Sequence, residues 1–368
     1  MWVNLMIDLL QLLYKKNASK VDFDKIPNMN LNDIELFSIA PQIYFLLKKN
    51  NLFNDISLQS KKSIKEQYKR RFFQNLVVKQ ETNKALSAFE EYKLKVIPLK
   101  GTLFAETYFG HFSARVTSDI DLLVHPNDIE KAKELIIKIG YVPNEIETDH
   151  FHICFKKKLT DSMFISLELH WNLMKENTSD INIETFWFNA IPLENYQFVK
   201  MFSTQHTFYF ICLHGARHRM QEVKYLLDIV QMLFYFGNYI DYIELFKQAK
   251  QDRTLKKLIM ALSVVYRQFP DLYTIKPFHP NVLSMIWSYK EMRKIAIGDI
   301  HSVYNHIYEF IFKVTLNDTW NHRVISLKEW FFPELKDNSL FSKYIFYLVR
   351  RRINTFRKLF SRKTGNNI

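Results

Sequence analysis

The stretch VIPLKGTLFAETYFGHFSARVTSDIDLLVHP, residues 96–126, decides the fold. Its apolar runs at 96–99 and 120–124 predict two short strands, and Pro98 limits the first to an edge or terminal position of a sheet. Residues 103–109 between them predict a short helix that ends at Gly110. This order of strand, helix and strand indicates a small α/β unit.

The segment that follows continues the pattern. Residues 129–139 carry apolar side chains at helical spacing, and Gly140 ends that helix. Residues 151–155 and 164–170 alternate between the two faces of a strand, which predicts a hairpin around residues 159–162. The sheet is therefore expected to be small and mixed.

Helical patterns precede and follow this unit. Residues 60–92 contain no Gly or Pro and predict one long helix, and helical spacing returns from about Phe186 to the end of the chain. We predict the fold class α/β (α+β), with a helical N-terminal segment, a small core and a helical C-terminal domain at residues 1–92, 93–175 and 176–368.

Composition narrows the classes of function. The chain has 368 residues, of which 48% are hydrophobic and 24% charged, so it is expected to form globular cores. It has seven glycines, where average usage gives roughly 26, which argues against turn-rich all-β folds and a glycine-rich dinucleotide site. Two cysteines make neither a disulfide framework nor a cysteine-rich zinc site.

The N-terminus and the charge distribution predict a cytoplasmic protein with one basic segment. Residues 1–16 are apolar but contain Asp8 and lack the basic start of a secretory signal, and no window suits a transmembrane helix. The net charge is +13, and residues 341–368 hold eight basic residues and no acidic one. This tail is either a solvated helix face or a contact to an anionic surface such as RNA or lipid.

Two acidic residues at the start of a predicted strand carry the chemistry. Asp119 and Asp121 lie two positions apart, which places both carboxylates on one face of the sheet. Their repulsion, roughly 4 kcal/mol at 4 Å and an effective dielectric near 20, is relieved by water or a cation between them. Hard ions such as Mg²⁺ bind carboxylates together with phosphate oxygens, so we predict a Mg²⁺ (or Mn²⁺) site here. An isolated pair of this kind is more often a solvated turn, but this one follows a strand, a glycine and a helix.

Glu168 is the candidate for a third carboxylate ligand. Alternation along its strand places it opposite Ile165 and Leu167, hence away from the core. The alternative is an exposed strand residue paired with a lysine. His170 shares the face of Glu168 and is a candidate substrate contact.

The segment Lys100-Gly101-Thr102 is the candidate nucleotide-binding element. A strand that ends at glycine and opens a helix presents free N–H groups to phosphate, and Gly101 allows a close backbone approach. Thr102 can cap the helix or bind an oxygen, and Lys100 can contact a phosphate as a point charge. Arg115 precedes the acidic pair and is expected either to bind phosphate or to form a structural ion pair.

Three residues further along the chain have structural interpretations. His214 and His218 are four residues apart on a predicted helix, but no third ligand accompanies them, so packing or substrate contact is favoured over zinc. Asp228 follows an aromatic and aliphatic run and is expected to accept hydrogen bonds that tie the helical C-terminal lobe to the core.

These motifs resemble the uncharacterised nucleotidyltransferase family of the polymerase β-type superfamily. The resemblance rests on Lys100-Gly101, Arg115, the run Asp119 to Val124, and the segment Glu168-Leu169-His170-Trp171, and it extends to His214–His218 and Leu226-Leu227-Asp228. It implies a minimal nucleotidyltransferase fold in which Asp119, Asp121 and Glu168 bind metal and the nucleotide lies near Gly101. The chain departs from the superfamily in having Gly-Thr instead of Gly-Ser and a longer gap before Asp119.

The expected function is therefore enzymatic. We predict a Mg²⁺-dependent nucleotidyltransferase that moves a nucleoside monophosphate from an NTP, such as ATP, to a hydroxyl-bearing acceptor and releases pyrophosphate. The acceptor is a small molecule, a peptide, a protein side chain or tRNA. Two alternatives are a non-catalytic binding protein that keeps the fold, and an RNA- or membrane-surface binder that uses the basic tail.

Overall fold

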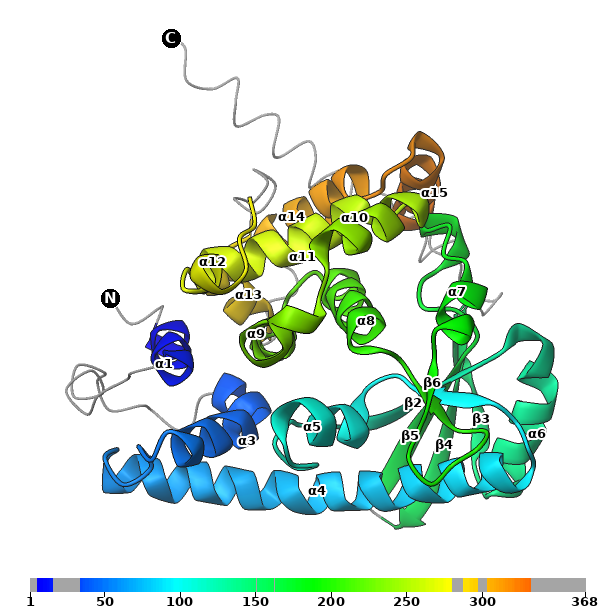
Figure 1. Cartoon of the computed structure of the whole chain (residues 1–368), viewed down its shortest axis with the longest axis horizontal. Helices are drawn as coiled ribbons and strands as arrows, with labels where there is room; N and C mark the ends of the chain where they lie inside the picture. Colours follow the sequence, from blue (N-terminus) through cyan, green and yellow to red (C-terminus); the bar gives the residue numbers. More distant parts are fainter. Residues whose placement is uncertain are drawn as a thin grey trace.

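The computed structural model describes residues 5–15, 34–149, 151–161, 163–279, 287–296 and 303–331. It confirms the expected α/β class, because helices surround one five-stranded mixed sheet (Figure 1). The strands lie in the order β1-β2-β5-β4-β3 and are β1 (Val96–Pro98), β2 (Asp119–Val124), β3 (Val142–Asp149), β4 (His152–Thr160) and β5 (Met163–His170).

The strand pairing places the acidic segments side by side. β2 is parallel to β5, whereas β1 with β2, β4 with β5 and β3 with β4 are antiparallel. β1 is an edge strand, as Pro98 predicted, since proline cannot donate to a central ladder. The hairpin of β4 and β5 also agrees with its prediction.

Helices precede, interrupt and follow the sheet. Those of the first half are α1 (Leu5–Tyr14), α3 (Ile34–Lys49), α4 (Leu58–Glu91), α5 (Gly101–Phe109), α6 (Ile129–Lys138) and α7 (Ile183–Phe188), with short 3-10 turns η1 (Pro126–Asp128) and η2 (Glu176–Thr178). Those of the second half are α8 (Thr204–Arg217), α9 (Val223–Phe236), η3 (Gly237–Tyr239), α10 (Tyr242–Gln251), α11 (Leu255–Gln268), α12 (Leu272–Ile275), α13 (Tyr289–Ala296), α14 (Val303–Thr315) and α15 (Trp320–Phe331).

The two faces of the sheet have different partners. One face packs under α4 and α6 in a core that includes Phe89, Ile120, Leu122, Leu167 and Leu169. Side chains of the opposite parity, among them Asp119, Asp121 and Glu168, project to the other face. In Figure 1 α8 and α9 lie on that side and α4 runs along the opposite side. The sheet thus has a dry face and a polar face.

A second, larger core joins the ends of the described chain. Buried side chains of α1 and α3 belong to the same apolar cluster as those of α8, α9 and α11. Leu99 and Phe104 from the segment around α5 also belong to it. Because the N- and C-terminal helices share this core, the division of the chain at residues 92 and 175 stays a prediction.

Two features of the sheets were not predicted from the sequence. β3 was missed because Pro143 and polar residues interrupt its alternation, and its pairing with β4 is itself irregular between Pro143 and Thr148. A two-stranded sheet of β6 (Ile191–Pro192) and β7 (Lys200–Met201) lies within the region expected to be wholly helical. Residues 30–33, His150 and the basic segment 341–368 lie outside the described residues.

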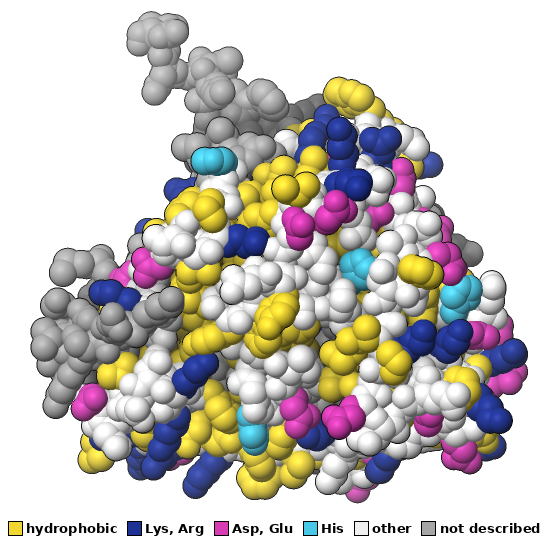
Figure 2. All heavy atoms as spheres, in the orientation of Figure 1, with side chains coloured by type: hydrophobic (Ala, Val, Ile, Leu, Met, Phe, Trp, Pro, Cys, Tyr) yellow, Lys and Arg dark blue, Asp and Glu magenta, His cyan; other side chains and the backbone are white. Residues whose placement is uncertain are grey.

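The described surface carries mixed charge. On the face shown in Figure 2, basic side chains lie in several groups around the margin, with acidic side chains between them. None of the helices in the described part of the chain combines the length and apolar content needed to cross a bilayer.

Candidate active site

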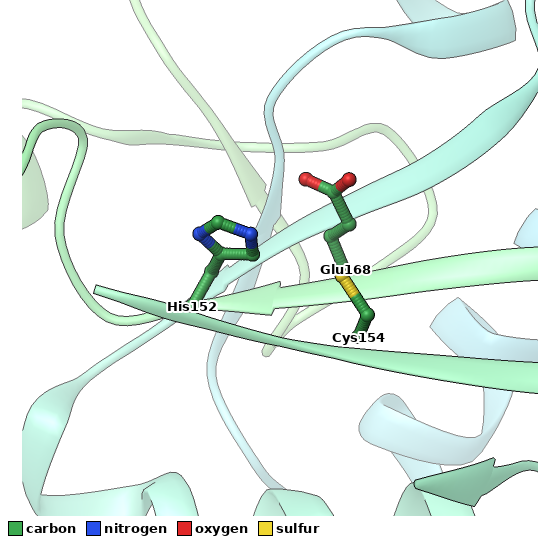
Figure 3. Close-up of side chains that lie close together, drawn as sticks. All are labelled: His152, Cys154 and Glu168. Carbon is green, nitrogen blue, oxygen red and sulfur yellow. The ribbon is translucent and has the colours of Figure 1, made fainter. Parts of the chain in front are cut away.

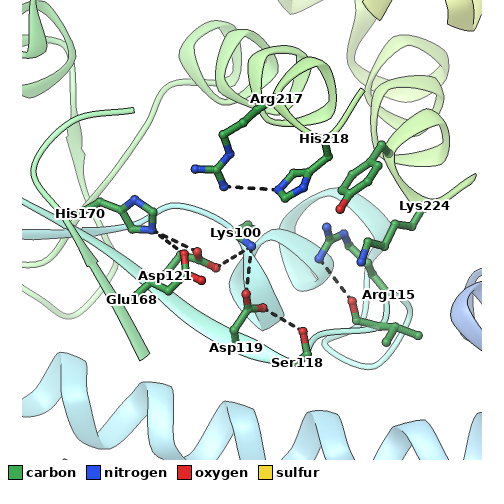
Figure 4. A network of polar contacts seen from close by, with 12 residues as sticks. Lys100, Arg115, Ser118, Asp119, Asp121, Glu168, His170, Arg217, His218 and Lys224 are labelled. Carbon is green, nitrogen blue, oxygen red and sulfur yellow. Dashed lines mark hydrogen bonds and ion pairs between the residues drawn. The ribbon is translucent and has the colours of Figure 1, made fainter. Parts of the chain in front are cut away.

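The structure brings the three predicted acidic residues together. Asp119 and Asp121 begin β2 and share a face because strand side chains alternate. Asp121 lies directly opposite Glu168 of β5 in the parallel ladder, so Glu168 projects to the same face. Figure 4 shows the three carboxylates grouped beside Lys100. Asp121 is buried, with 1% of its side chain exposed, whereas Asp119 and Glu168 are 26% and 22% exposed.

Lys100 places a cation between the two aspartates. Its Nζ lies 3.2 Å from Asp119 Oδ2 and 3.0 Å from Asp121 Oδ2. Burial alone would lower the pKa of Lys100, but the charges of Asp121, Asp119 and Glu168 raise it above its ordinary value. The same ion pair, with the hydrogen bond from His170, outweighs burial and lowers the pKa of Asp121. The ammonium is therefore held where the carboxylate oxygens converge.

The backbone around Lys100 turns sharply to begin α5. Gly101 has φ of +83°, a left-handed conformation that costs a side-chain-bearing residue about 1–2 kcal/mol. A Cβ there would meet Thr117 Cγ2 at 3.6 Å, an ordinary contact, so conformation and not space requires glycine. Thr102 is buried in the first turn of α5. The first N–H groups of a helix lack intrahelical acceptors, so this end of α5 offers donors beside Lys100.

His170 connects two of the carboxylates. Its Nε2 lies 3.3 Å from Asp121 Oδ1 and 3.2 Å from Glu168 Oε2. Burial would raise the pKa of Glu168, but the hydrogen bond and charge of His170, with Lys100, lower it to about 2. Burial would likewise lower the pKa of His170, and its bonds to Asp121 and Glu168 raise it instead. His170 thus orients the acidic residues, a role closer to positioning than to the predicted substrate contact.

The acidic cluster has the donors for a hard metal ion. Ligand atoms of Asp121, Glu168 and His170 all lie within 4.8 Å of one another. Asp121 Oδ2 is buried and accepts no well-aligned hydrogen bond from the described residues, although Lys100 Nζ is 3.0 Å away. A buried carboxylate oxygen with spare acceptor capacity, among further carboxylates, suits Mg²⁺ or Mn²⁺. The residues present therefore fit the expected ion.

Arg115 forms a structural ion pair, one of the two roles expected of it from the sequence. It is buried, and its Nε and Nη2 donate to Asp228 Oδ1 and Oδ2 of α9, both at 2.7 Å. Its Nη1 approaches the carbonyl of Val116 at 3.4 Å. With the guanidinium engaged in this way, the contacts are those of the structural ion pair that the sequence left as an alternative. They also confirm Asp228 as the acceptor that ties the helical lobe to the core.

A buried asparagine fixes the loop that leads into the site. Asn75 of α4 is fully buried, and its Nδ2 donates to the carbonyls of Phe112 and Arg115. Its Oδ1 accepts the N–H of Thr117. The amide thus holds the backbone just before Asp119 against α4. Asn75 was not predicted from the sequence. The one pattern that could have indicated it is a polar amide within the apolar stripe of a long helix.

The helical lobe contributes Arg217, which was not predicted from the sequence, and His218 to the space opposite the acidic cluster. Arg217 and His218 end α8, and Figure 4 shows them across from Lys100 and His170. Burial, then the charges of Arg217, Lys100 and Lys224, lower the pKa of His218 to about 3, so its ring is neutral. That ring stacks on Tyr225, with centroids 5.1 Å apart. His214 contacts the same two rings, so the pair packs as an aromatic group, as the sequence favoured over zinc.

Comparisons with known proteins identify the family of the chain. A solved structure described as a "putative nucleotidyltransferase from H. pylori" aligns over 62% of this chain and 94% of that chain, at 14% identity and a TM-score of 0.31. None of the curated proteins matches the chain significantly. The model of the uncharacterised nucleotidyltransferase family matches residues 36–270, which include the sheet, the acidic cluster and the ends of α8 and α9. The chain therefore belongs to the family of uncharacterised nucleotidyltransferases.

Proposed function

We propose that this protein is a Mg²⁺-dependent enzyme that transfers a nucleoside monophosphate from an NTP to a hydroxyl group of an acceptor. The observation that carries the proposal is the convergence of Asp119, Asp121 and Glu168 beside Lys100 at the start of α5. Family membership supports nucleotidyl transfer as the general reaction. Three carboxylates beside a helix N-terminus fit a divalent ion together with phosphate groups.

Each acidic residue has a distinct role in this proposal. Asp119 and Asp121 hold the divalent ion, and Ser118 Oγ orients Asp119 by a hydrogen bond of 3.2 Å to its Oδ1. Glu168 would complete the ligand set, and as a partly exposed carboxylate beside the ion it is the candidate to accept the proton of the acceptor hydroxyl. When bound, the ion neutralises phosphate charge and steadies the leaving pyrophosphate.

The cationic residues bind the triphosphate. Lys100 sits between the aspartates, and its ammonium would contact the phosphates when the carboxylates hold a divalent ion. Gly101 and Thr102 offer backbone N–H groups at the start of α5. Arg217 faces the same space from α8, and we assign it the phosphate contact that was expected of Arg115. The helical lobe thus supplies the second wall of the nucleotide site.

Labelled nucleotides test the reaction directly. The full-length protein is incubated with each of the four NTPs, labelled at the α-phosphate, in Mg²⁺ and a cell extract, and the label is followed into RNA, protein and small molecules. We expect transfer of this α-label. In parallel incubations with NTPs labelled at the γ-phosphate, we expect no transfer of label. Transfer of the γ-phosphate would instead indicate a kinase and contradict the proposal.

Two matched variants serve as controls. Asp119→Asn should abolish the transfer, whereas Asp128→Asn, which changes a partly exposed aspartate in η1 outside the site, should leave it unchanged. Equal transfer by wild type and Asp119→Asn would show that the activity does not come from this acidic cluster. A product found in only one chemical class would identify the acceptor.

A further inference from the structure

A second group of potential ligands lies on the same sheet face, next to the acidic cluster. It consists of His152 and Cys154 of β4 and Glu168 of β5, whose ligand atoms all lie within 4.8 Å of one another. Figure 3 shows the three side chains on one side of the two strands. Cys154 is one of only two cysteines in the chain, and it is buried and not in a disulfide.

Strand register explains why these residues meet. Cys154 lies opposite Glu168, which lies opposite Asp121 on the next strand. His152 lies opposite His170, and the two rings stack with centroids 5.0 Å apart. The polar face therefore carries a row of Asp121, Glu168 and Cys154, flanked by the two histidines. Glu168 stands in the middle of this row and belongs to both groups.

The two groups differ in the kind of metal ion that they suit. Asp119, Asp121 and Glu168 offer carboxylate oxygens, which Mg²⁺ prefers. His152, Cys154 and Glu168 offer one nitrogen, one sulfur and one oxygen, a set that favours Zn²⁺ over Mg²⁺ because thiolate and imidazole are softer ligands. Three protein ligands leave a fourth tetrahedral position for water.

We propose that His152, Cys154 and Glu168 form a Zn²⁺ site that shares Glu168 with the Mg²⁺ site, so that zinc inhibits the enzyme. Zinc binding displaces the thiol proton of Cys154 to solvent, since the thiolate is the ligand. Glu168 bound to zinc no longer completes the ligand set of Asp119 and Asp121. The inhibitory effect rests on the function proposed for Glu168, whereas the binding of zinc does not.

Cobalt binding tests the site without any assay of activity. Co²⁺ is added to the metal-free, full-length protein, and a thiolate-to-cobalt charge-transfer band in the near ultraviolet is expected. Cys154→Ser should lose the band, and Cys212→Ser, which changes the buried cysteine of α8, should keep it. His152→Asn should weaken Co²⁺ binding about tenfold or more. Absence of the band in wild type, or its persistence in Cys154→Ser, would overturn the proposal.

Alkylation of the wild-type protein gives a test that does not depend on the folding of a variant. Zn²⁺ should slow the reaction of iodoacetamide with Cys154 at least tenfold, whereas Mg²⁺ should not, as followed by mass spectrometry. Cys212 is the internal reference. An unchanged rate at Cys154 in the presence of Zn²⁺ would overturn the site.

The inhibitory effect is measured against Mg²⁺-dependent transfer. Cys154→Ser should require at least tenfold more Zn²⁺ for half inhibition than wild type. Equal inhibition of both proteins would place the inhibitory ion elsewhere and overturn the sharing of Glu168. If no transfer is found but the cobalt band forms as expected, the zinc site stands and the proposed function fails.

Discussion

Two groups of opposite charges lie close together in this molecule, and they differ in how completely each is enclosed and paired. Between Arg115 and Asp228, two parallel hydrogen bonds of 2.7 Å occupy both carboxylate oxygens, and neither side chain is more than 4% exposed. In the acidic cluster, three carboxylates share Lys100 and His170, and Asp119 and Glu168 remain 26% and 22% exposed. The first group is complete, whereas the second retains acceptor capacity for a ligand.

This difference distinguishes charged groups that stabilise the fold from charged groups that can bind a ligand. A bidentate pair has no remaining affinity for a cation, and it holds the loop before β2 against α9. The acidic cluster is stabilised without a metal by Lys100 and His170, yet both cations can be exchanged for a divalent ion and substrate phosphates. The two groups also differ in burial, because Arg115 and Asp228 are at most 4% exposed, whereas Asp119 and Glu168 are 26% and 22% exposed.

The largest expected effect comes from breaking the complete pair. Asp228→Ala leaves the guanidinium of Arg115 buried without its partner, so the free energy of unfolding should fall by about 3–5 kcal/mol. The double variant Arg115→Met/Asp228→Leu should recover much of this loss, because no charge remains buried. Urea denaturation monitored by circular dichroism measures both. A loss below about 1 kcal/mol for Asp228→Ala would show that the pair is not structural.

Asp121→Asn should have a large effect on activity and a small effect on stability, in contrast to Asp228→Ala. Nucleotidyl transfer should fall about a hundredfold or more, because a metal ligand is lost. The free energy of unfolding should fall by only about 1–2 kcal/mol, since Lys100 and His170 keep Asp119 and Glu168 as partners. Single-turnover kinetics and urea denaturation give the two values. Retained transfer with an unchanged Mg²⁺ requirement would remove Asp121 from the site.

The pH dependence of stability should report the contact of His170 with Glu168. The pKa of Glu168 is lowered from 4.5 to about 2, so its contribution is complete above pH 4.5 and is lost as the pH falls through about 2. The pKa of His170 is raised above 6.5, so its contribution is complete below pH 6.5 and is lost as the pH rises through the folded-state value. Both contributions are therefore present between pH 4.5 and 6.5.

His170→Gln isolates this contact. In EDTA, wild type should exceed the variant in unfolding free energy by about 1 kcal/mol within that window, and the difference should shrink at alkaline pH. Thermal unfolding across a pH series measures it. A difference that grows toward alkaline pH would mean that His170 is held neutral, contrary to the contacts described here.

The smallest expected effect concerns two glycines with the same conformation. Gly101 and Gly110 have φ of +83° and +84°, so alanine at either position should lower the free energy of unfolding by about 1–2 kcal/mol. Only Gly101 adjoins Lys100, and Gly101→Ala alone should also raise the KM for NTP. Equal KM values for the two variants would contradict a role of the start of α5 in nucleotide binding.

Local spacing predicted most of the sheet and the acidic cluster. Alternation assigned Asp119, Asp121 and Glu168 to faces correctly, because strand parity is a local property. Parity does not give register, so the row from Asp121 through Glu168 to Cys154 emerged only from the pairing of β2, β5 and β4. The stacking of His152 on His170 has the same origin.

Contacts distant in sequence account for what the sequence did not predict. Arg115 and Asp228 are separated by 113 positions, and neither residue type nor spacing distinguishes a phosphate ligand from the partner of a remote carboxylate. Arg217 reaches the site because α8 and α9 pack on the polar side of the sheet, a tertiary arrangement that helical periodicity does not specify. β3 was missed for a local reason instead, since Pro143 weakens the alternation by which a strand is predicted from the sequence.

The parallel pairing of β2 with β5 also determines when the site can form. The β4–β5 hairpin closes locally, but Asp121 meets Glu168 only after α6, β3 and β4 have been traversed and β5 has docked on β2. Contacts of such sequence separation form slowly, because the intervening chain loses entropy before they contribute. During synthesis, Lys100 and both aspartates therefore emerge from the ribosome before Glu168, the third carboxylate. Acquisition of metal affinity would mark completion of the sheet in a refolding experiment.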